Sequence, residues 1–328
     1  MPTNLPPQYF EVERRYREAK TPEAKVEFLE EMLTIIPKHK GTDKLRAGLR
    51  HKISKFKSQS QKKKGTSRHE SAYSVRREGA AQVVIIGPPN TGKSSLLDTL
   101  TNAEPEVADF PHSTWKPLPG MAPYENIQFQ LIDTPPLTGD YIDPLMGDLI
   151  RRADIIVIVL DLHGPILDQY EETLRLLRDL RIFPEGQPVD QDLGKPPFLK
   201  KILVLVNKVD DARDGEDYDI FMELVELTLP SVGVSVSNRR NLDGFLQALY
   251  TLSHIIRIYT KPAGKEPDLS APFVLPKDST LDDLALQIHR DFTDQLKYAK
   301  IWGKNVFDGQ MVQRDYVLQE GDVVEIHI

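Results

Sequence analysis

The sequence predicts an α/β protein with a mostly parallel sheet, a helical segment before it and a small mixed-sheet unit after it. Short β-branched runs alternate with helical patterns from about residue 80 to residue 253, which favours parallel strands covered on both faces. Apolar residues recur at helical spacing before this stretch, and strand patterns surround one helix pattern after it. We therefore expect the 328 residues to form three domains, spanning residues 1–75, 78–253 and 254–328.

The first 75 residues are expected to form a helical hairpin, followed by a polar linker. Thr21 and Pro22 mark a helix start, because a capping hydroxyl precedes a proline at the first helical position. One apolar stripe runs up to Pro37, and a second begins after Gly41. The two stripes comprise Val26, Leu29, Leu33 and Ile36, and then Leu45, Leu49, Ile53 and Phe56.

A strongly basic arm lies within this segment, from residue 38 to residue 68. It contains 12 lysines and arginines and one acid, Asp43, whereas the whole chain has a net charge of −7. The local charge is therefore +11, and the remaining residues carry −18. A basic arm on an acidic body is typical of proteins that contact polyanions, so we expect the arm to bind RNA or the ribosome. A solvated helix face that docks on the protein's own acidic surface is the alternative.

Five strands are expected in the central segment, each a short and mostly β-branched apolar run. Residues 183–198 are rich in proline and glycine, and we expect them to form a surface loop before the fourth strand. The five expected strands are residues 81–87, 127–133, 153–161, 201–207 and 233–237.

The C-terminal segment is expected to form a mixed sheet crossed by one helix. Strand patterns cover residues 255–261, 297–304 and 322–328, and in the last of them alternate residues are apolar and face inward. The helix pattern covers residues 278–292, with Ser279 or Thr280 as its capping residue.

A phosphate-binding pattern lies between the first central strand and a helix pattern. Gly87 and Gly92 are separated by four residues, and Lys93 and Ser94 follow directly. In this context, backbone N–H groups wrap phosphates at a helix N-terminus. The lysine reaches the β- and γ-phosphates, and the serine ligates Mg²⁺. A chance Gly-Lys-Ser turn is the alternative, but it does not explain the strand and helix patterns on both sides.

A guanine-recognition pattern follows the fourth central strand. Asn207, Lys208 and Asp210 form an Asn-Lys-x-Asp sequence. A carboxylate at its last position accepts from the ring N–H and the exocyclic amine that guanine presents together and adenine does not. The pattern therefore predicts selection of GTP over ATP. Downstream, residues 235–237 offer a loop that packs on the base.

Two further positions are expected to hold Mg²⁺. Asp133 closes the second central strand, where a carboxylate can hold the ion through water. Residues 108–120 form the expected first switch loop, in which Ser113 and Thr114 both carry a hydroxyl that could ligate the ion. Of the two, we expect Thr114 to be the ligand.

The second switch departs from the usual pattern. Asp133 is followed by Thr134, Pro135 and Pro136, where GTP-hydrolysing proteins usually have Asp-x-x-Gly. Proline has no N–H to donate to the γ-phosphate. Two alternatives are open: the N–H of Leu137 reaches the phosphate instead, or the first switch senses it alone through Thr114. Leu137 also has no polar group to orient an attacking water.

Several stretches resemble the Obg-type GTPases, and most closely their developmentally regulated GTP-binding (DRG) branch. Residues 108–120, ADFPHSTWKPLPG, resemble that branch's first switch, Tyr-Pro-Phe-Thr-Thr-x-x-Pro-x-x-Gly, with His112 and Ser113 as departures. Residues 255–328 are similar to its C-terminal TGS domain, a β-grasp fold, and KHKGTDKL resembles the helical hairpin before its GTPase domain. Only roughly 40 residues separate Asp161 from Asn207, so the small domain that the branch inserts in its GTPase domain is missing here.

The resemblance implies GTP binding, slow hydrolysis and work near ribosomes or RNA, and a protein partner of the TGS domain is a further expectation. By this resemblance, Thr114 matches the threonine that ligates Mg²⁺ in the branch. Asn90 matches the asparagine that helps some relatives hold K⁺. For Asn90, a loop residue that caps its own backbone is the alternative. The expected catalytic residues are Lys93, Thr114 and Asn90, and the expected metal ligands are Ser94, Thr114 and Asp133. The expected contacts to GTP or GDP are Gly87, Asn90, Thr91, Gly92, Lys93, Ser94, Ser95, Asp133, Asn207, Lys208, Asp210, Ser235 and Val236.

Composition narrows the functional classes. The chain has no cysteine, which excludes disulfides and thiolate metal sites. No apolar run reaches the length of a membrane span, and the polar N-terminus lacks the apolar core of a secretory signal, so we expect a cytoplasmic protein without membrane contacts. The first hypothesis is a slow Mg²⁺-dependent GTPase that switches on RNA or the ribosome. The alternatives are a GTP-binding scaffold that hardly hydrolyses and a structural RNA-binding protein with a vestigial nucleotide site, although the intact motifs argue against the last.

Overall fold

The structure is a computed structural model of the chain, in which two compact units are distinguished, residues 1–74 and residues 75–328. The units are described separately. The residues described are 12, 14–16, 22–35, 49, 75–101, 117–137, 142–189, 194–225, 228–289 and 296–327.

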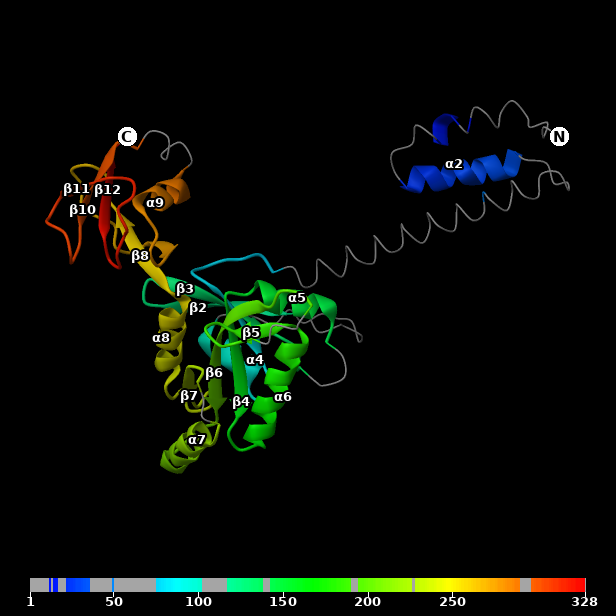
Figure 1. Cartoon of the computed structure of the whole chain (residues 1–328), viewed down its shortest axis with the longest axis horizontal. Helices are drawn as coiled ribbons and strands as arrows, with labels where there is room; N and C mark the ends of the chain where they lie inside the picture. The colour runs from blue at the N-terminus through cyan, green and yellow to red at the C-terminus, as the bar shows by residue number, and fades with distance from the viewer. Residues whose placement is uncertain are drawn as a thin grey trace. The chain divides into compact units, whose positions relative to one another are not determined.

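The first unit contains helix α2 (Pro22–Ile35), drawn in blue in Figure 1. Its first residue is the proline that the sequence marks as a helix start, and the helix ends just before Pro37. Leu29 and Met32 are buried on one face of α2, in a small cluster with Val12 and Leu49. Apart from Leu49, the second helix of the expected hairpin and the basic arm lie outside the described residues.

The second unit begins with a mostly parallel sheet that has the strand order β2-β3-β1-β4-β6-β5, and β7 also pairs with β6 (Figure 1). Among the residues that the structure describes, β2 and β3 are the one antiparallel pair of this sheet, and they form a hairpin. This confirms the predicted α/β class. The strands are β1 (Gln82–Ile86), β2 (Leu118–Tyr124), β3 (Ile127–Asp133), β4 (Ile155–Asp161), β5 (Ile182–Pro184), β6 (Phe198–Asn207) and β7 (Ser231–Gly233).

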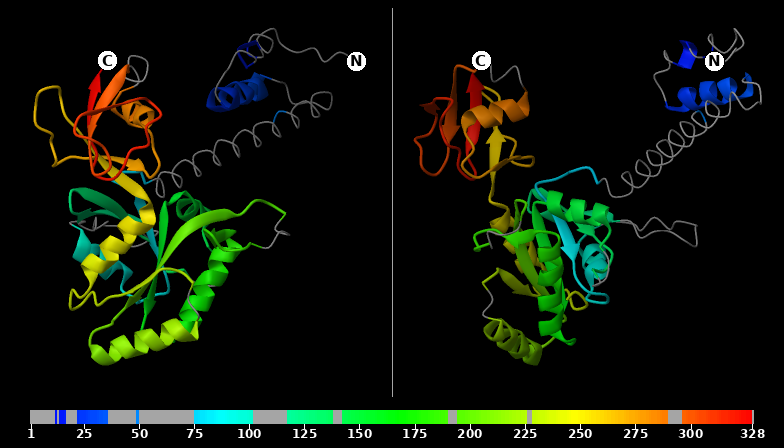
Figure 2. Two further views of the ribbon diagram at one scale, coloured as in Figure 1. Left: turned by 60° about the vertical axis from the view of Figure 1, so that its left-hand side comes forward. Right: turned by 45° about the vertical axis from the view of Figure 1, so that its right-hand side comes forward.

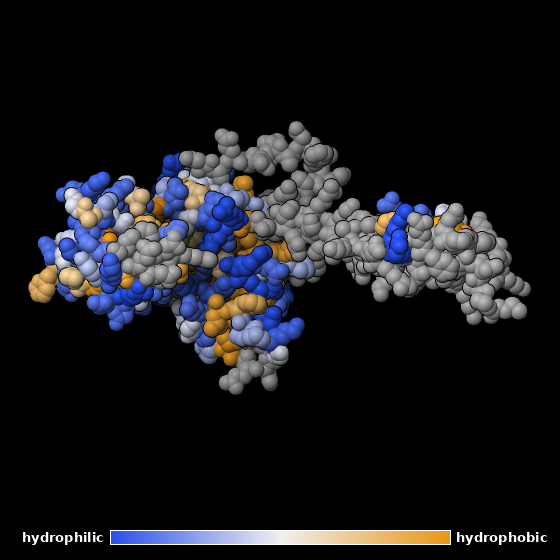
Figure 3. All heavy atoms as spheres, turned by 90° about the horizontal axis from the view of Figure 1, so that it is seen from above, coloured by the Kyte–Doolittle hydropathy of each residue, from blue (hydrophilic) through white to orange (hydrophobic). Residues whose placement is uncertain are grey.

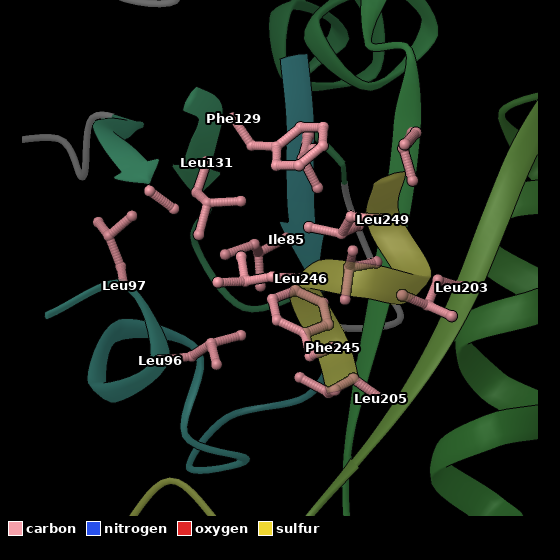
Figure 4. Packing of buried hydrophobic residues seen from close by; sticks show 14 of the residues in the cluster. Ile85, Leu96, Leu97, Phe129, Leu131, Leu203, Leu205, Phe245, Leu246 and Leu249 are labelled. Atoms are coloured by element: carbon pink, nitrogen blue, oxygen red, sulfur yellow. The ribbon is translucent and has the colours of Figure 1, made fainter. Parts of the chain in front are cut away.

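Helices cover both faces of this sheet. Two of them, α4 and α8, pack on the face that carries Ile85, Leu131 and Leu205, and Figure 4 shows this cluster. Helix α6 packs on β4 and β5 (Figure 2). Every residue of β1 is buried, as expected for a strand covered on both sides. The helices are α4 (Lys93–Leu100), α5 (Pro144–Arg152), α6 (Ile166–Asp179), α7 (Ala212–Leu224) and α8 (Leu242–Ser253).

Three details of the sheet differ from the prediction. Strand β2 was not expected, and residues 118–120 of the expected first switch loop are its start. The fifth expected strand, residues 233–237, is displaced toward the N-terminus, because β7 ends at Gly233. The N–H of Val234 still donates to Val206 of β6 at 2.8 Å, and Ser235 and Arg240 then exchange backbone hydrogen bonds at 3.1 and 2.9 Å in a turn. The expected loop at 183–198 begins as a strand, because β5 runs parallel to the start of β6 at the sheet edge. Pro184 is tolerated there as the last residue of an edge strand.

The C-terminal part of the second unit is a second sheet with the order β11-β10-β12-β8-β9 and one crossing helix (Figure 1). Thr280, one of the two expected caps, starts α9 and forms a reciprocal capping box with Asp283. Leu284 of α9 packs on Ile258, Ile301 and other buried residues of the sheet. The elements are β8 (Ile255–Thr260), β9 (Phe273–Pro276), α9 (Leu281–Ile288), β10 (Tyr298–Trp302), β11 (Gln310–Val312) and β12 (Val323–His327).

The turn of the β2–β3 hairpin contacts β8. Asn126 donates its side-chain amide to the Tyr259 hydroxyl at 2.7 Å. The Arg257 guanidinium pairs with Glu125 of the turn and with Glu320, and lies 5.1 Å from the centre of the Tyr250 ring on α8. The hairpin turn, the end of α8 and the second sheet therefore share one polar contact.

The coloured surface in Figure 3 is mainly hydrophilic, with hydrophobic residues in small groups. None of the helices among the described residues is both long and apolar enough to cross a membrane.

Candidate functional site

The phosphate-binding loop joins β1 to α4, and its two glycines are required by close contacts. Gly87 has a φ of 148°, and a Cβ there would lie 2.4 Å from the carbonyl oxygen of Val159 in β4. Gly92 has a φ of 93°, and a Cβ there would lie 2.3 Å from Nδ2 of Asn207. Only glycine adopts these conformations without strain and leaves this room.

Lys93 is the first residue of α4, and its side chain turns back over the loop. Its ammonium donates to the carbonyl oxygens of Gly87 at 3.1 Å and Pro88 at 2.5 Å. Burial lowers the pKa of Lys93, while the charge of Asp133 opposes the shift. The loop thus holds a desolvated cation at its centre, where it is suited to phosphate oxygens.

Ser94 and Asp133 form a second polar pair beside the loop. The Ser94 hydroxyl donates to Oδ2 of Asp133 at 2.6 Å. Asp133 is only 4% exposed, and within the described residues its Oδ1 has no hydrogen-bond partner. Burial raises the pKa of Asp133, opposed by the Ser94 hydrogen bond and the Lys93 charge. A buried carboxylate oxygen without a donor, next to a serine hydroxyl, fits a hard cation such as Mg²⁺, which prefers oxygen ligands.

Asn207, at the end of β6, ties three segments together. Its side-chain amide donates to the carbonyl oxygen of Thr91 in the phosphate loop at 2.9 Å. Its Oδ1 accepts from the backbone N–H of Lys208 at 2.8 Å and of Val236 at 3.1 Å. Asn207 is buried, so these bonds fix the phosphate loop relative to the two segments expected to hold the base.

Asp210 and Lys208 are fixed by further polar contacts. Asp210 accepts at Oδ1 from the hydroxyls of Ser235 and, at 3.2 Å, Ser237. Lys208 has a φ of 70° and places its ammonium 2.5 Å from Oδ2 of Asp161, the last residue of β4. The Asp210 carboxylate is therefore oriented by hydroxyl donors on one side of the segment, and Lys208 is anchored on the other.

The structure brings most of the expected site residues together. Thr91 and Val236 are buried beside Asn207, whereas Ser95 is exposed on α4. Asn90 is exposed with a φ of 63°, and no hydrogen bond of its side chain is found within the described part of the loop. Thr114 and the rest of residues 102–116 lie outside the described residues.

The segment after Asp133 is bound to the phosphate loop and to β1. The N–H of Leu137 donates to the Gly87 carbonyl oxygen at 3.3 Å, and the Leu137 side chain is buried. The Thr134 hydroxyl donates to the carbonyl oxygen of Ile85 at 2.7 Å. The Leu137 N–H, which was one alternative donor to the γ-phosphate in place of the missing Pro136 N–H, is thus bonded to the phosphate-binding loop itself.

Three residues of the site carry no motif that identifies them in the sequence: Asp161, His163 and Asp214. Asp161 could have been suspected, because it ends a buried strand next to the strand that leads to Asn207. His163 and Asp214 are 51 residues apart and meet only in the fold, where Nε2 of His163 lies 2.9 Å from Oδ1 of Asp214.

Comparisons with known proteins identify two domains in this chain and several similar proteins. Residues 82–195 match the model of a 50S ribosome-binding GTPase, and residues 256–328 match the TGS domain. An uncharacterized GTP-binding protein of Methanocaldococcus jannaschii is 28% identical, with 93% of each chain covered. Developmentally-regulated GTP-binding protein 2 of Homo sapiens is 25% identical over 92% of this chain and 98% of that protein. Among solved structures, the G domain of a T. maritima FeoB iron transporter covers 53% of this chain and 98% of its own, with 21% identity and a TM-score of 0.39.

The fold and the site define a P-loop GTP-binding protein. More specifically, the chain combines a GTPase domain with a C-terminal TGS domain, and several relatives over most of its length are named developmentally regulated GTP-binding proteins. The alignment to the archaeal relative extends over 363 positions but covers only 93% of the 328 residues here. Roughly 60 positions of that relative therefore have no counterpart in this chain, in line with the expected loss of an inserted domain.

Proposed function

We propose that this chain is an Obg-type, Mg²⁺-dependent GTPase that hydrolyses GTP slowly and acts as a switch on the ribosome or on RNA in the cytoplasm. The observation that carries this proposal is the bond network of Asn207, which links Thr91 of the phosphate loop at 2.9 Å with Val236 at 3.1 Å. The network supports a guanine nucleotide bound with its phosphates on the loop and its base against Asp210. The thirteen expected nucleotide contacts are retained as our assignment, with domains at residues 1–75, 78–253 and 254–328.

The phosphate side of the site is suited to a nucleotide with Mg²⁺. Ser94 would ligate the ion directly and Asp133 through water, with Thr114 as the proposed ligand from the first switch. Bound there, Mg²⁺ neutralises charge on the β- and γ-phosphates. Lys93 would exchange its two carbonyl acceptors for phosphate oxygens, which carry more charge.

Slow hydrolysis is supported by Leu137. Its apolar side chain is 6% exposed and packs inside the protein, so it cannot orient an attacking water as a glutamine does in other GTPases. A second candidate function rests on the same observation: a GTP-binding scaffold that hardly hydrolyses and binds RNA or protein through its basic arm and TGS domain. Single-turnover hydrolysis with and without ribosomes separates the two, because a switch is accelerated by its target and a scaffold is not.

The ribosome or RNA as partner is supported by the description of the matching GTPase model and by the charge of residues 38–68. Because binding through a basic arm releases counterions, log affinity for RNA should fall steeply with log salt concentration. A chain without residues 1–75 should bind ribosomes more weakly than the full chain. Equal binding by both chains would exclude the arm from the interface.

The guanine assignment is tested with Asp210→Asn. The amide then offers an N–H₂ where guanine needs an acceptor, and the lost charged hydrogen bonds cost ~2–4 kcal/mol, a tens- to hundreds-fold loss in GDP affinity. Xanthosine diphosphate, which has a carbonyl in place of the exocyclic amine, should recover part of the binding. Calorimetry with GDP, ATP and xanthosine diphosphate measures this, and Asp217→Asn, which removes the same charge from the exposed face of α7, is the control. Unchanged GDP affinity in Asp210→Asn would show that the base binds elsewhere.

A further inference from the structure

The carboxylate of Asp214 is bonded to two neighbouring elements. It lies in the first turn of α7, where its Oδ2 accepts from the backbone N–H of Asp210 at 2.8 Å and of Asp211 at 3.2 Å. Its Oδ1 lies 2.9 Å from Nε2 of His163, in the loop between β4 and α6. The backbone of the proposed guanine-binding carboxylate is thus held by Asp214.

His163 joins Asp214 to the other end of the guanine-recognition segment. The backbone N–H of His163 donates to Oδ1 of Asp161 at 3.0 Å. Oδ2 of the same Asp161 receives the ammonium of Lys208 at 2.5 Å. His163 therefore lies between two carboxylates, one of which holds Lys208 and the other Asp210.

We propose that His163 and Asp214 are positioning residues for guanine recognition, and that the affinity for guanine nucleotides falls as the pH rises and His163 loses its proton. The inference rests on the proposed function, because it assumes that Asp210 binds the base. Neither residue needs to touch the nucleotide. Asp214 holds the backbone N–H groups of Asp210 and Asp211. The backbone N–H of His163 binds Asp161, which receives the side-chain ammonium of Lys208.

The surroundings of His163 favour its charged form. Asp214 on α7, Asp161 at the end of β4 and Asp210 in the recognition segment all face it with negative charge, and Lys208 neutralises part of the charge of Asp161. The hydrogen bond with Asp214 raises the pKa of His163, and the same bond lowers the pKa of Asp214. The charged pair is complete below the ordinary pKa of histidine and is lost as the pH rises through the raised value. Neutral His163 can still donate Nε2–H, so the contact weakens but does not disappear.

The expected effect is modest because the His163 side chain is 51% exposed. Exposed ion pairs contribute little, so GDP affinity should fall about two- to fivefold between pH 5.5 and pH 8.5 through this pair. Binding and protonation are linked, so GDP should in turn raise the pKa of His163.

Calorimetry of the full chain with GDP over this pH range tests the proposal. The terminal phosphate of GDP also titrates near pH 6, so the relevant quantity is the difference between the wild type and His163→Gln. The glutamine keeps a neutral donor, and we expect its GDP affinity to lack the two- to fivefold component. His254→Gln, which changes another exposed histidine beyond the end of α8, should keep the wild-type pH profile.

A second measurement follows the imidazole of His163 by NMR with and without GDP. A pKa that rises on adding GDP supports the proposal, and an unchanged pKa overturns it. A wild-type pH profile in His163→Gln also overturns it, provided that Asp210→Asn has lost GDP affinity. If Asp210→Asn binds GDP normally, the proposed function itself fails. Because the His163 side chain is half exposed, His163→Gln should fold normally. Asp214→Ala is less suitable as a test, because it removes an acceptor of two backbone N–H groups and could prevent folding.

Discussion

Replacing Gly92 by alanine should separate the phosphate loop from the guanine-recognition segment. The φ of Gly92 is 93°, and an added Cβ would lie 2.3 Å from Nδ2 of Asn207. That amide must move, although it is buried and donates to Thr91 at 2.9 Å. Gly186 has a similar φ of 81°, but no described atom lies within 4 Å of its added Cβ. Gly186→Ala therefore reproduces the backbone strain without the collision.

The magnitude follows from two contributions. A left-handed alanine costs about 1–2 kcal/mol in either variant. In Gly92→Ala, breaking the bond between Asn207 and Thr91 leaves buried polar groups unpaired, which costs a further ~1–3 kcal/mol. Gly92→Ala should therefore be less stable than Gly186→Ala by this second amount, and its GDP affinity should fall at least tenfold because Asn207 also holds Val236.

Urea unfolding measures the stability of both variants, and calorimetry measures their affinity for GDP. The linear extrapolation is applied with the same slope for the two proteins. The expected coupling is refuted if the free energies of unfolding of Gly92→Ala and Gly186→Ala agree within about 0.5 kcal/mol and Gly92→Ala binds GDP like the wild type. Asn207 would then not couple the phosphate loop to the guanine-recognition segment.

Three further variants test other parts of the site. Because burial raises the pKa of Asp133, stability falls as the pH rises from the ordinary aspartate pKa to the raised one, and the loss is constant above it. Asp133→Asn should therefore be at least as heat-stable as the wild type at pH 7 but lose the effect of Mg²⁺ on GTP affinity. A less stable variant whose GTP affinity still responds to Mg²⁺ would contradict this. GTP hydrolysis should be faster in KCl than in NaCl and equal in both salts for Asn90→Ala, since a held cation would stabilise developing charge; equal wild-type rates would rule out the ion. Pro136→Gly adds an N–H donor worth up to ~1.5–3 kcal/mol, so it should favour a non-hydrolysable GTP analogue over GDP. A wild type that already prefers the analogue strongly would show that the segment after Asp133 senses the γ-phosphate without this donor.

The contiguous motifs made much of the fold and site predictable. The buried runs of β1, β4 and β6 are mostly apolar, and β3 begins with alternating apolar and polar residues, so their strand class follows from the sequence. Strand β2 escaped the prediction because Pro119, Gly120 and Pro123 read as a loop, although an edge strand paired on one side tolerates them.

The supporting contacts of the site were not predictable in the same way. Asp210 belongs to a motif, but Asp214, which accepts from its backbone N–H, and His163, which bonds Asp214, come from different elements and meet only after folding. The hydrogen bond from the Leu137 N–H to the Gly87 carbonyl oxygen likewise depends on where the chain turns after β3. Short motifs specify the atoms that touch the ligand, whereas the atoms that orient them are set by tertiary packing.

The contact between the β2–β3 turn and β8 affects how the GTPase domain would behave if excised. A cut after Ser253 follows the domain boundary but removes Arg257 and Tyr259. Glu125 and Asn126 would lose the cation and hydroxyl that they bind, and the Tyr250 ring would lose its cover. The freed turn joins the strand after the first switch to the strand that ends in Asp133. A shortened protein should therefore fray at this hairpin, be cleaved there by proteases, and give nucleotide affinities that describe a loosened domain.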